Sequence, residues 1–106
     1  MDESRIRAEQ LLTLSSAARR VSDLVAAAGA PVRYEVLRHL LRTSEEDMID
    51  ALNETIAVEL VRRGDDPFMY VPFDEATGAA IRESMGEERA ARLRAQLAGA
   101  AARVGE

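Results

Sequence analysis

Residues 44–71 read SEEDMIDALNETIAVELVRRGDDPFMYV and contain the two patterns that decide the fold. The first pattern is a helix start, because Ser44 is followed three residues later by a carboxylate, as in a capping box. The apolar residues that follow recur at helical spacing: Met48, Ile49, Leu52 and Ile56. The second pattern is a pair of β-prone runs, 60–63 and 68–71, around a Gly-Asp-Asp-Pro turn. The stretch therefore predicts a helix that leads into a β-hairpin.

Two helices are predicted upstream of this stretch. Apolar residues recur at three- and four-residue steps over residues 14–28, which is the stripe of an amphipathic helix. Ser15 or Thr13 would cap this helix, and Gly29 would end it. The next helix is expected over residues 34–42. Its inward-facing side chains would be Val36, Leu37, Leu40 and Leu41.

Two more helices are predicted downstream of the hairpin. Asp74 would cap the first of them, which runs to Met85, and Gly86 would separate it from a last helix over residues 87–104. A separate short helix is expected at the other end of the chain, over residues 4–12. The inward positions expected on the last helix are Ala91, Leu93, Leu97 and Ala101.

Three helices followed by a two-stranded hairpin is the element order of a winged helix-turn-helix fold. A chain of 106 residues is long enough for one modest core and too short for a second independent domain. We therefore predict a mostly α, single domain over residues 1–106. It would consist of a helical extension over 1–13, a helical core with its β-hairpin wing over 14–73, and C-terminal helices over 74–106.

The composition restricts the classes of function. A net charge of −5 has the wrong sign for a protein that mainly neutralises phosphates or coats an anionic membrane. Cysteine is absent, which excludes a disulfide framework and a thiolate metal site. The charged N-terminus lacks the apolar core of a secretion signal, and the weakly polar run over residues 24–32 is too short to span a bilayer. We therefore expect a cytoplasmic protein with no membrane contact.

Charge is distributed unevenly along the chain. By count, residues 1–43 carry +2, residues 44–86 carry −8 and residues 87–106 carry +1. Between Ser44 and Leu60 there are six acidic residues and no basic one. A helix in this position often enters the major groove of DNA, but these carboxylates would repel the phosphates. The asymmetry fits pairing within the domain, or docking on another protein or a second copy.

Three stretches resemble a known family: LSSAARR at 14–20, the Ser-Glu-Glu start of the third helix, and IRESM at 81–85 with the arginine-rich last helix. They are similar to the winged-helix region that follows the ATPase in STAND-type bacterial transcription regulators, including those that end in a LuxR-type DNA-binding domain. The resemblance implies a winged helix that packs against a nucleotide-binding core, helps to hold the regulator inactive and does not read DNA.

This chain departs from the family at two positions. A His and an Arg that are common early in the helix after the wing correspond to Asp74 and Gly78 here. A nucleotide-sensing role for that His is therefore not carried over, because Asp74 would repel phosphate. The sequence also lacks a glycine-rich phosphate loop with a following Lys, so these residues are not themselves an ATPase.

We expect no enzyme activity, no metal and no cofactor. The single histidine, His39, lies beside apolar residues and has no metal-ligand spacing around it. Ser15 and Ser16 have no neighbouring His that would mark a nucleophile. The acidic run at the start of the third helix is explained by the helix dipole.

The leading prediction is a non-catalytic interaction module of a bacterial transcription regulator, or a free-standing relative, that binds a protein, a neighbouring domain or a second copy in a homodimer. The residues expected to contact the partner are Arg62, Arg63, Glu46, Asp50, Glu54, Arg89, Arg92 and Arg94. An apolar stripe on the last helix would allow close approach of such a partner: Ala90, Leu93, Leu97 and Ala101. The alternative is a DNA-binding transcriptional regulator that uses the wing and the basic terminal helices.

Overall fold

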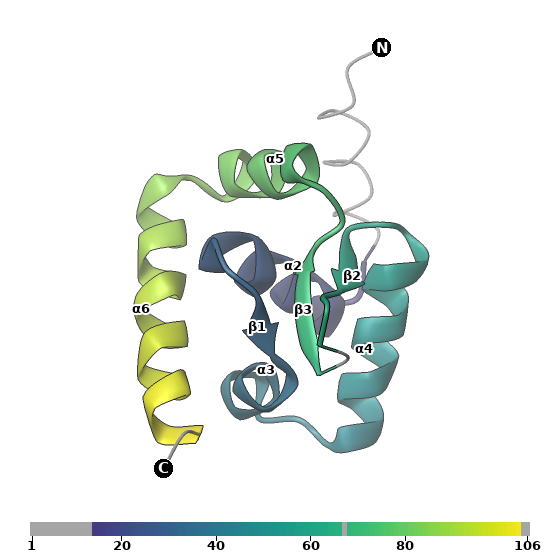
Figure 1. The fold of residues 1–106 in the computed structure, drawn as a ribbon. Coiled ribbons are helices and arrows are strands. Elements are labelled where there is room, and N and C mark those ends of the chain that lie inside the picture. The colour runs from purple at the N-terminus through teal and green to yellow at the C-terminus, as the bar shows by residue number, and fades with distance from the viewer. Residues whose placement is uncertain (1–13, 67, 105–106) are drawn as a thin grey trace.

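The computed structural model describes residues 14–66 and 68–104, and it is mostly helical with one small antiparallel sheet (Figure 1). In chain order the elements are α2 (Ser16–Ala28), β1 (Val32–Arg33), α3 (Tyr34–Leu41), α4 (Glu45–Ala57), β2 (Val61–Arg63), β3 (Met69–Pro72), α5 (Glu75–Met85) and α6 (Glu87–Val104). The helices and the hairpin predicted within this part of the chain are confirmed. The predicted helix over residues 4–12 lies outside the described residues.

Side-chain caps set the starts of three helices, as the sequence indicates. The Ser15 hydroxyl accepts a hydrogen bond from the Ala18 amide at 3.2 Å, which decides between the two predicted caps of α2. Ser44 caps α4 in the same way, and Asp74 caps α5. Gly29 ends α2 in the left-handed region, with a φ of 69°. Such a φ favours glycine because it has no Cβ.

The three strands form a sheet in the order β1-β3-β2, with both pairs antiparallel. The hairpin pairs Val61 with Pro72, and the Gly64 amide donates to the Met69 carbonyl at 2.8 Å to close the turn. β1 was not predicted, because two residues give no detectable alternation of apolar and polar side chains. It pairs Val32 with Tyr70 and so joins the start of α3 to the hairpin.

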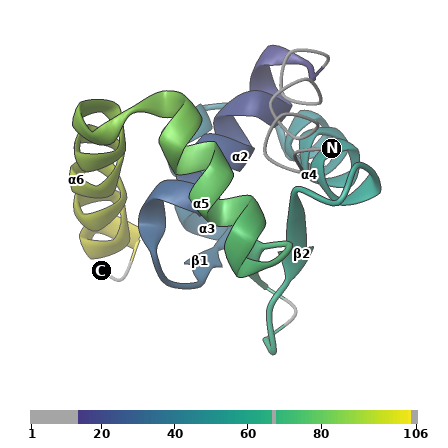
Figure 2. The same ribbon diagram turned by 90° about the horizontal axis from the view of Figure 1, so that it is seen from above.

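α2 lies at the centre of the helical packing and contacts α3, α4, α5, α6 and β3. Its seven consecutive residues 21–27 are all buried. Figure 2 shows α6 and α4 on opposite sides of the molecule, with α5 crossing between them. Burial of α2 by neighbours on every side therefore builds the core. No helix within the described residues is long and apolar enough to cross a membrane.

Two predictions of inward-facing residues are wrong. Ile49 is 46% exposed, because α4 packs through Met48, Ala51, Leu52 and Thr55, which places Ile49 outside the contact with α2. On α6 the buried residues are Ala90, Leu97 and Ala100, while Ala91 and Ala101 are exposed. Alanines occupy so many positions of α6 that the sequence alone does not define which side faces inward.

The apolar stripe expected on the outside of α6 is therefore largely used within the chain. Ala90 and Leu97 are buried, and Leu93 packs against the core from a partly buried position. α6 makes its contacts with α2, α3 and α5. This stripe offers little apolar surface to a partner.

Substitution of two helical glycines by alanine should give different results. A Cβ at Gly99 would meet nothing within 4 Å, so Gly99→Ala should raise the free energy of unfolding by about 0.5–1 kcal/mol through helix propensity. A Cβ at Gly78 would lie 3.1 Å from Pro72 Cγ and 3.3 Å from Arg82 Nη1. Gly78→Ala should therefore gain less than Gly99→Ala, or lose stability. Urea unfolding followed by circular dichroism measures both, and equal gains would contradict tight packing of α5 on β3.

Candidate functional site

One side of α4 is exposed and acidic, and its residues are named here the α4 face: Glu46, Ile49, Asp50 and Asn53. Spacings of three, four and seven residues place them along one side of a helix. Ile49 lies between the two carboxylates and is one of two large apolar side chains left exposed among the described residues. The α4 face therefore combines an apolar centre with negative charge.

The charges of the α4 face are not neutralised within the described part of the chain. Neither Glu46 nor Asp50 makes an ion pair or side-chain hydrogen bond there. The two are four residues apart on one helix, where like charges disfavour the helix by a few tenths of a kcal/mol. The helix dipole favours acids in the first turn, but Asp50 lies beyond it. This repulsion decreases if a cationic partner covers the face.

Glu54 lies one turn further along α4 and has a different environment. Its Oε1 accepts a hydrogen bond from the Ser15 amide at 3.0 Å, and its Oε2 accepts one from the Ser15 hydroxyl at 2.7 Å. These hydrogen bonds, from the hydroxyl first and the amide second, lower the pKa of Glu54, while its slight burial acts in the opposite direction. Although Glu54 was predicted to contact a partner with Glu46 and Asp50, both of its oxygens already bind the start of α2.

Three arginines that are far apart in the sequence meet at one open groove of about 510 Å³: Arg62 on β2, Arg82 on α5 and Arg94 on α6. The apolar part of the lining consists of Ala27, Ala30, Pro31, Val71 and Pro72. Asp74 and Glu75 also line it, and Asp74 Oδ1 is occupied by both the amide and the hydroxyl of Thr77. We name this feature the arginine groove, and it is locally positive in a protein whose net charge is −5.

The three guanidinium groups of the arginine groove differ in how they are held. Arg62 is exposed and donates from Nε to the Phe73 carbonyl and from Nη1 to the Arg63 carbonyl, each at 3.2 Å. Arg82 is partly buried and donates from Nη1 to the Ala26 carbonyl at 2.9 Å. Arg94 is exposed and has no such bond within the described residues. Arg62 and Arg94 therefore retain donors for an anionic ligand.

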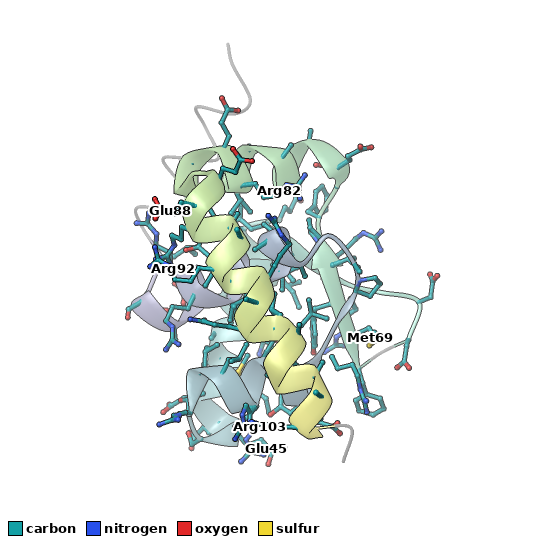
Figure 3. All side chains as sticks on the ribbon, turned by 90° about the vertical axis from the view of Figure 1, so that its left-hand side faces the viewer. Glu45, Met69, Arg82, Glu88, Arg92 and Arg103 are labelled. Carbon is teal, nitrogen blue, oxygen red and sulfur yellow. The ribbon has the colours of Figure 1, made fainter. Side chains whose placement is uncertain are left out.

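The other predicted arginines lie elsewhere. Arg89 forms an ion pair of 3.0 Å with Asp23 of α2, whose side chain is only 7% exposed. Arg92 is exposed and lies on the opposite side of α6 from Arg82 in Figure 3. Arg63 is exposed at the end of β2. The structure thus brings only Arg62 and Arg94 of the predicted arginines together, and it adds Arg82.

Sequence reasoning missed the positions of two charged residues, Arg82 and Asp23. Arg82 belongs to the arginine groove only because α5 returns across the end of α2. Asp23 is buried in a helix whose other buried residues are small or apolar, apart from Ser22. Its position inside the apolar stripe over residues 14–28 was the available signal, because a carboxylate there needs a cationic partner.

The described residues show no constellation typical of metal binding. No group of three or more His, Cys, Asp and Glu side chains in that part of the chain could hold a metal ion. His39 is exposed on α3, where it lines a shallow surface pocket with Arg38 and Arg42.

Replacement of Glu54 tests its contact with Ser15. A group whose pKa is lowered by folding stabilises the fold above its unfolded pKa, and this contribution is lost as the pH falls through the folded pKa. Glu54→Gln should therefore reduce the free energy of unfolding at neutral pH, by at most about 1 kcal/mol at an exposed site, and the difference should disappear in acid. Glu46→Gln is the matched control and should be neutral or slightly stabilising. Equal losses in both variants would contradict this assignment of Glu54.

Replacement of Arg89 tests the ion pair with Asp23. Arg89→Ala leaves a buried carboxylate without its cation, and we expect a loss of about 1–3 kcal/mol, reduced from the value of a fully buried pair because Arg89 is half exposed. Arg92→Ala, one turn along the same helix, should change stability by less than about 0.5 kcal/mol. Adding Asp23→Asn to Arg89→Ala should recover part of the loss. Thermal and urea unfolding measure these differences, and additive losses in the double variant would refute the coupling.

Comparisons with models of protein families, with curated proteins and with solved structures found no match for this chain. The relation to the winged-helix region of STAND-type regulators therefore stays a prediction from the stretches quoted above, at 14–20, at the start of α4 and at 81–85. The candidate functional site is accordingly defined by the geometry of this chain alone, as the α4 face and the arginine groove.

Proposed function

We propose that this chain is a winged helix-turn-helix module that acts by binding protein, either as the regulatory domain of a STAND-like transcription regulator or as a free-standing relative. The element order supports the fold, because a helix, a strand and two helices precede the hairpin. The position of β1 beside β3 supports it further, since this strand attaches the hairpin to the helical core. The sequence similarity supports the regulatory role.

The α4 face is the observation on which the choice of a protein partner rests. α4 follows α3 after a short turn, and in the proposed fold this is the position of a helix that reads DNA. It contains five acidic residues and no basic one. Docking on a duplex would bring these carboxylates close to phosphates, whereas Ile49 between Glu46 and Asp50 suits a partner with cationic and apolar side chains.

DNA binding through the wing and the basic helices is the alternative function. Of the arginines it would use, Arg89 pairs with Asp23, and Arg62 gives two of its five donors to backbone carbonyls. Arg63, Arg92 and Arg94 are exposed, but they lie on separate elements, β2 and α6. Phosphate contacts would have to come from these separate elements, while α4 itself carries five acidic residues and no basic one, which favours a protein partner.

Photo-crosslinking from the α4 face separates the two functions. A photoreactive amino acid at Ile49 should form an adduct with protein in cells, and the adduct should resist nuclease and disappear in the variant Glu46→Arg with Asp50→Arg. The same amino acid at the exposed position Ala101 of α6 is the control and should not give that adduct. The purified chain should not retard duplex DNA at low salt, where phosphate contacts are strongest. Retardation at low salt, or an adduct removed by nuclease, would refute protein binding through α4.

A further inference from the structure

We propose that the arginine groove of a second copy of this chain binds the α4 face. This inference rests on the proposed function and names its partner. The surfaces are complementary in charge, because Glu46 and Asp50 on one copy would meet Arg62 and Arg94 on the other. They are also complementary in polarity, since Ile49 would cover the apolar lining formed by residues such as Val71 and Pro72.

The guanidinium groups of the arginine groove have the capacity for this contact. A guanidinium has five N–H donors, and Arg62 uses its Nε and one Nη1 donor for backbone carbonyls. Arg94 makes no side-chain hydrogen bond within the described residues. Both side chains are exposed, so each can present a planar fork to a carboxylate, which is the geometry of the stronger ion pairs.

The carboxylates that line the groove do not cancel its charge. Asp74 caps α5 and accepts from the amide and hydroxyl of Thr77. Glu75 is exposed in the first turn of α5, where the helix dipole already favours it. Three arginines against these two acids leave the groove positive, and it is therefore suited to the negative α4 face.

The two surfaces cannot meet within one copy of the described structure. The groove is lined by residues of α2, β2, β3, α5 and α6 and by the segment that follows α2, but by none of α4. Figures 1 and 2 show α4 at the edge of the molecule opposite α6, which carries Arg94. A contact between unlike surfaces is heterologous, so each copy has one α4 face and one groove to offer. Successive copies would then add head to tail.

Sedimentation velocity with two charge-reversal variants tests the contact. The face variant carries Glu46→Arg and Asp50→Arg on the α4 face, and the groove variant carries Arg62→Glu and Arg94→Glu. The wild-type chain should form species larger than a dimer as its concentration rises, and each variant alone should associate at least about tenfold more weakly. A mixture of the two variants has opposite charges at both possible interfaces. The unchanged α4 face of the groove variant meets the unchanged groove of the face variant, and the two reversed surfaces meet with their charges exchanged. The mixture should therefore recover the association that each variant alone has lost.

Matched controls separate this contact from general effects of charge. One control chain carries Glu83→Arg with Glu88→Arg and changes the net charge as the face variant does. The other carries Arg92→Glu with Arg103→Glu and changes the net charge as the groove variant does. All four control positions are exposed and lie outside both surfaces, so these chains should associate as the wild type does. Circular dichroism checks that every variant is folded, and Arg94→Glu alone replaces the groove variant if loss of the Arg62 contacts unfolds it. Wild-type association should weaken as salt rises, since salt screens the ion pairs.

The outcomes distinguish this inference from the proposed function. If the wild type stays monomeric at high concentration and low salt, or if the mixed variants associate no better than each variant alone, the groove of a second copy is not the partner. An Ile49 adduct of another mass that survives nuclease would then still support protein binding by α4. If the adduct is also absent, the proposed function fails as well. If the matched controls abolish association, the contact is not specific to Glu46, Asp50, Arg62 and Arg94, and the inference is overturned.

Discussion

The enclosure of α2 is the constraint on which the rest of the structure depends. Residues 21–27 are buried on all sides of the helix, so every polar group they carry must find a partner inside the protein. The Ser22 hydroxyl donates to the Ala18 carbonyl, Asp23 pairs with Arg89, and the Ala26 carbonyl accepts from Arg82. α5 and α6 therefore cover α2 and also supply the cations that its polar groups need. The helices after the hairpin are therefore packed against the same central helix as those before it.

The same packing determines which charges remain on the surface. Arg89 and Glu54 are used to hold helices together, although their sequence context resembles that of their exposed neighbours. Glu46 and Asp50 lie on the side of α4 that α2 does not cover, and they make no ion pair within the described residues. An acidic helix at one edge and a cluster of arginines on other elements give the protein an uneven charge distribution. The overall charge of −5 conceals this separation.

Local signals in the sequence predicted the helices and the hairpin. The exposure of Ile49 and the formation of the arginine groove depend on packing between distant elements, so the sequence did not show them. Ser44 and Asp74 act within three residues of their own position, so their role as caps can be recognised without a structure. The hairpin likewise follows from its turn residues. Ile49 was predicted within the buried stripe because Met48 and Ile49 are adjacent and either could face inward. The contact with α2 buries Met48 and Leu52 and leaves Ile49 exposed. The arginine groove joins residues 62, 82 and 94, whose proximity depends on the path of the whole chain.

The hydrogen bond from Arg82 to Ala26 links a surface groove directly to the buried helix. The Ala26 carbonyl belongs to the last turn of α2, where carbonyl oxygens have no partner within the helix. An anion that drew the guanidinium of Arg82 outward would leave this carbonyl unsatisfied, and the end of α2 would become less stable. By thermodynamic linkage, a change that frays the end of α2 would in turn release Arg82 and strengthen anion binding in the groove. An anion in the groove and the interior would thus compete for one cation, and this competition would couple binding at the surface to the order of the central helix.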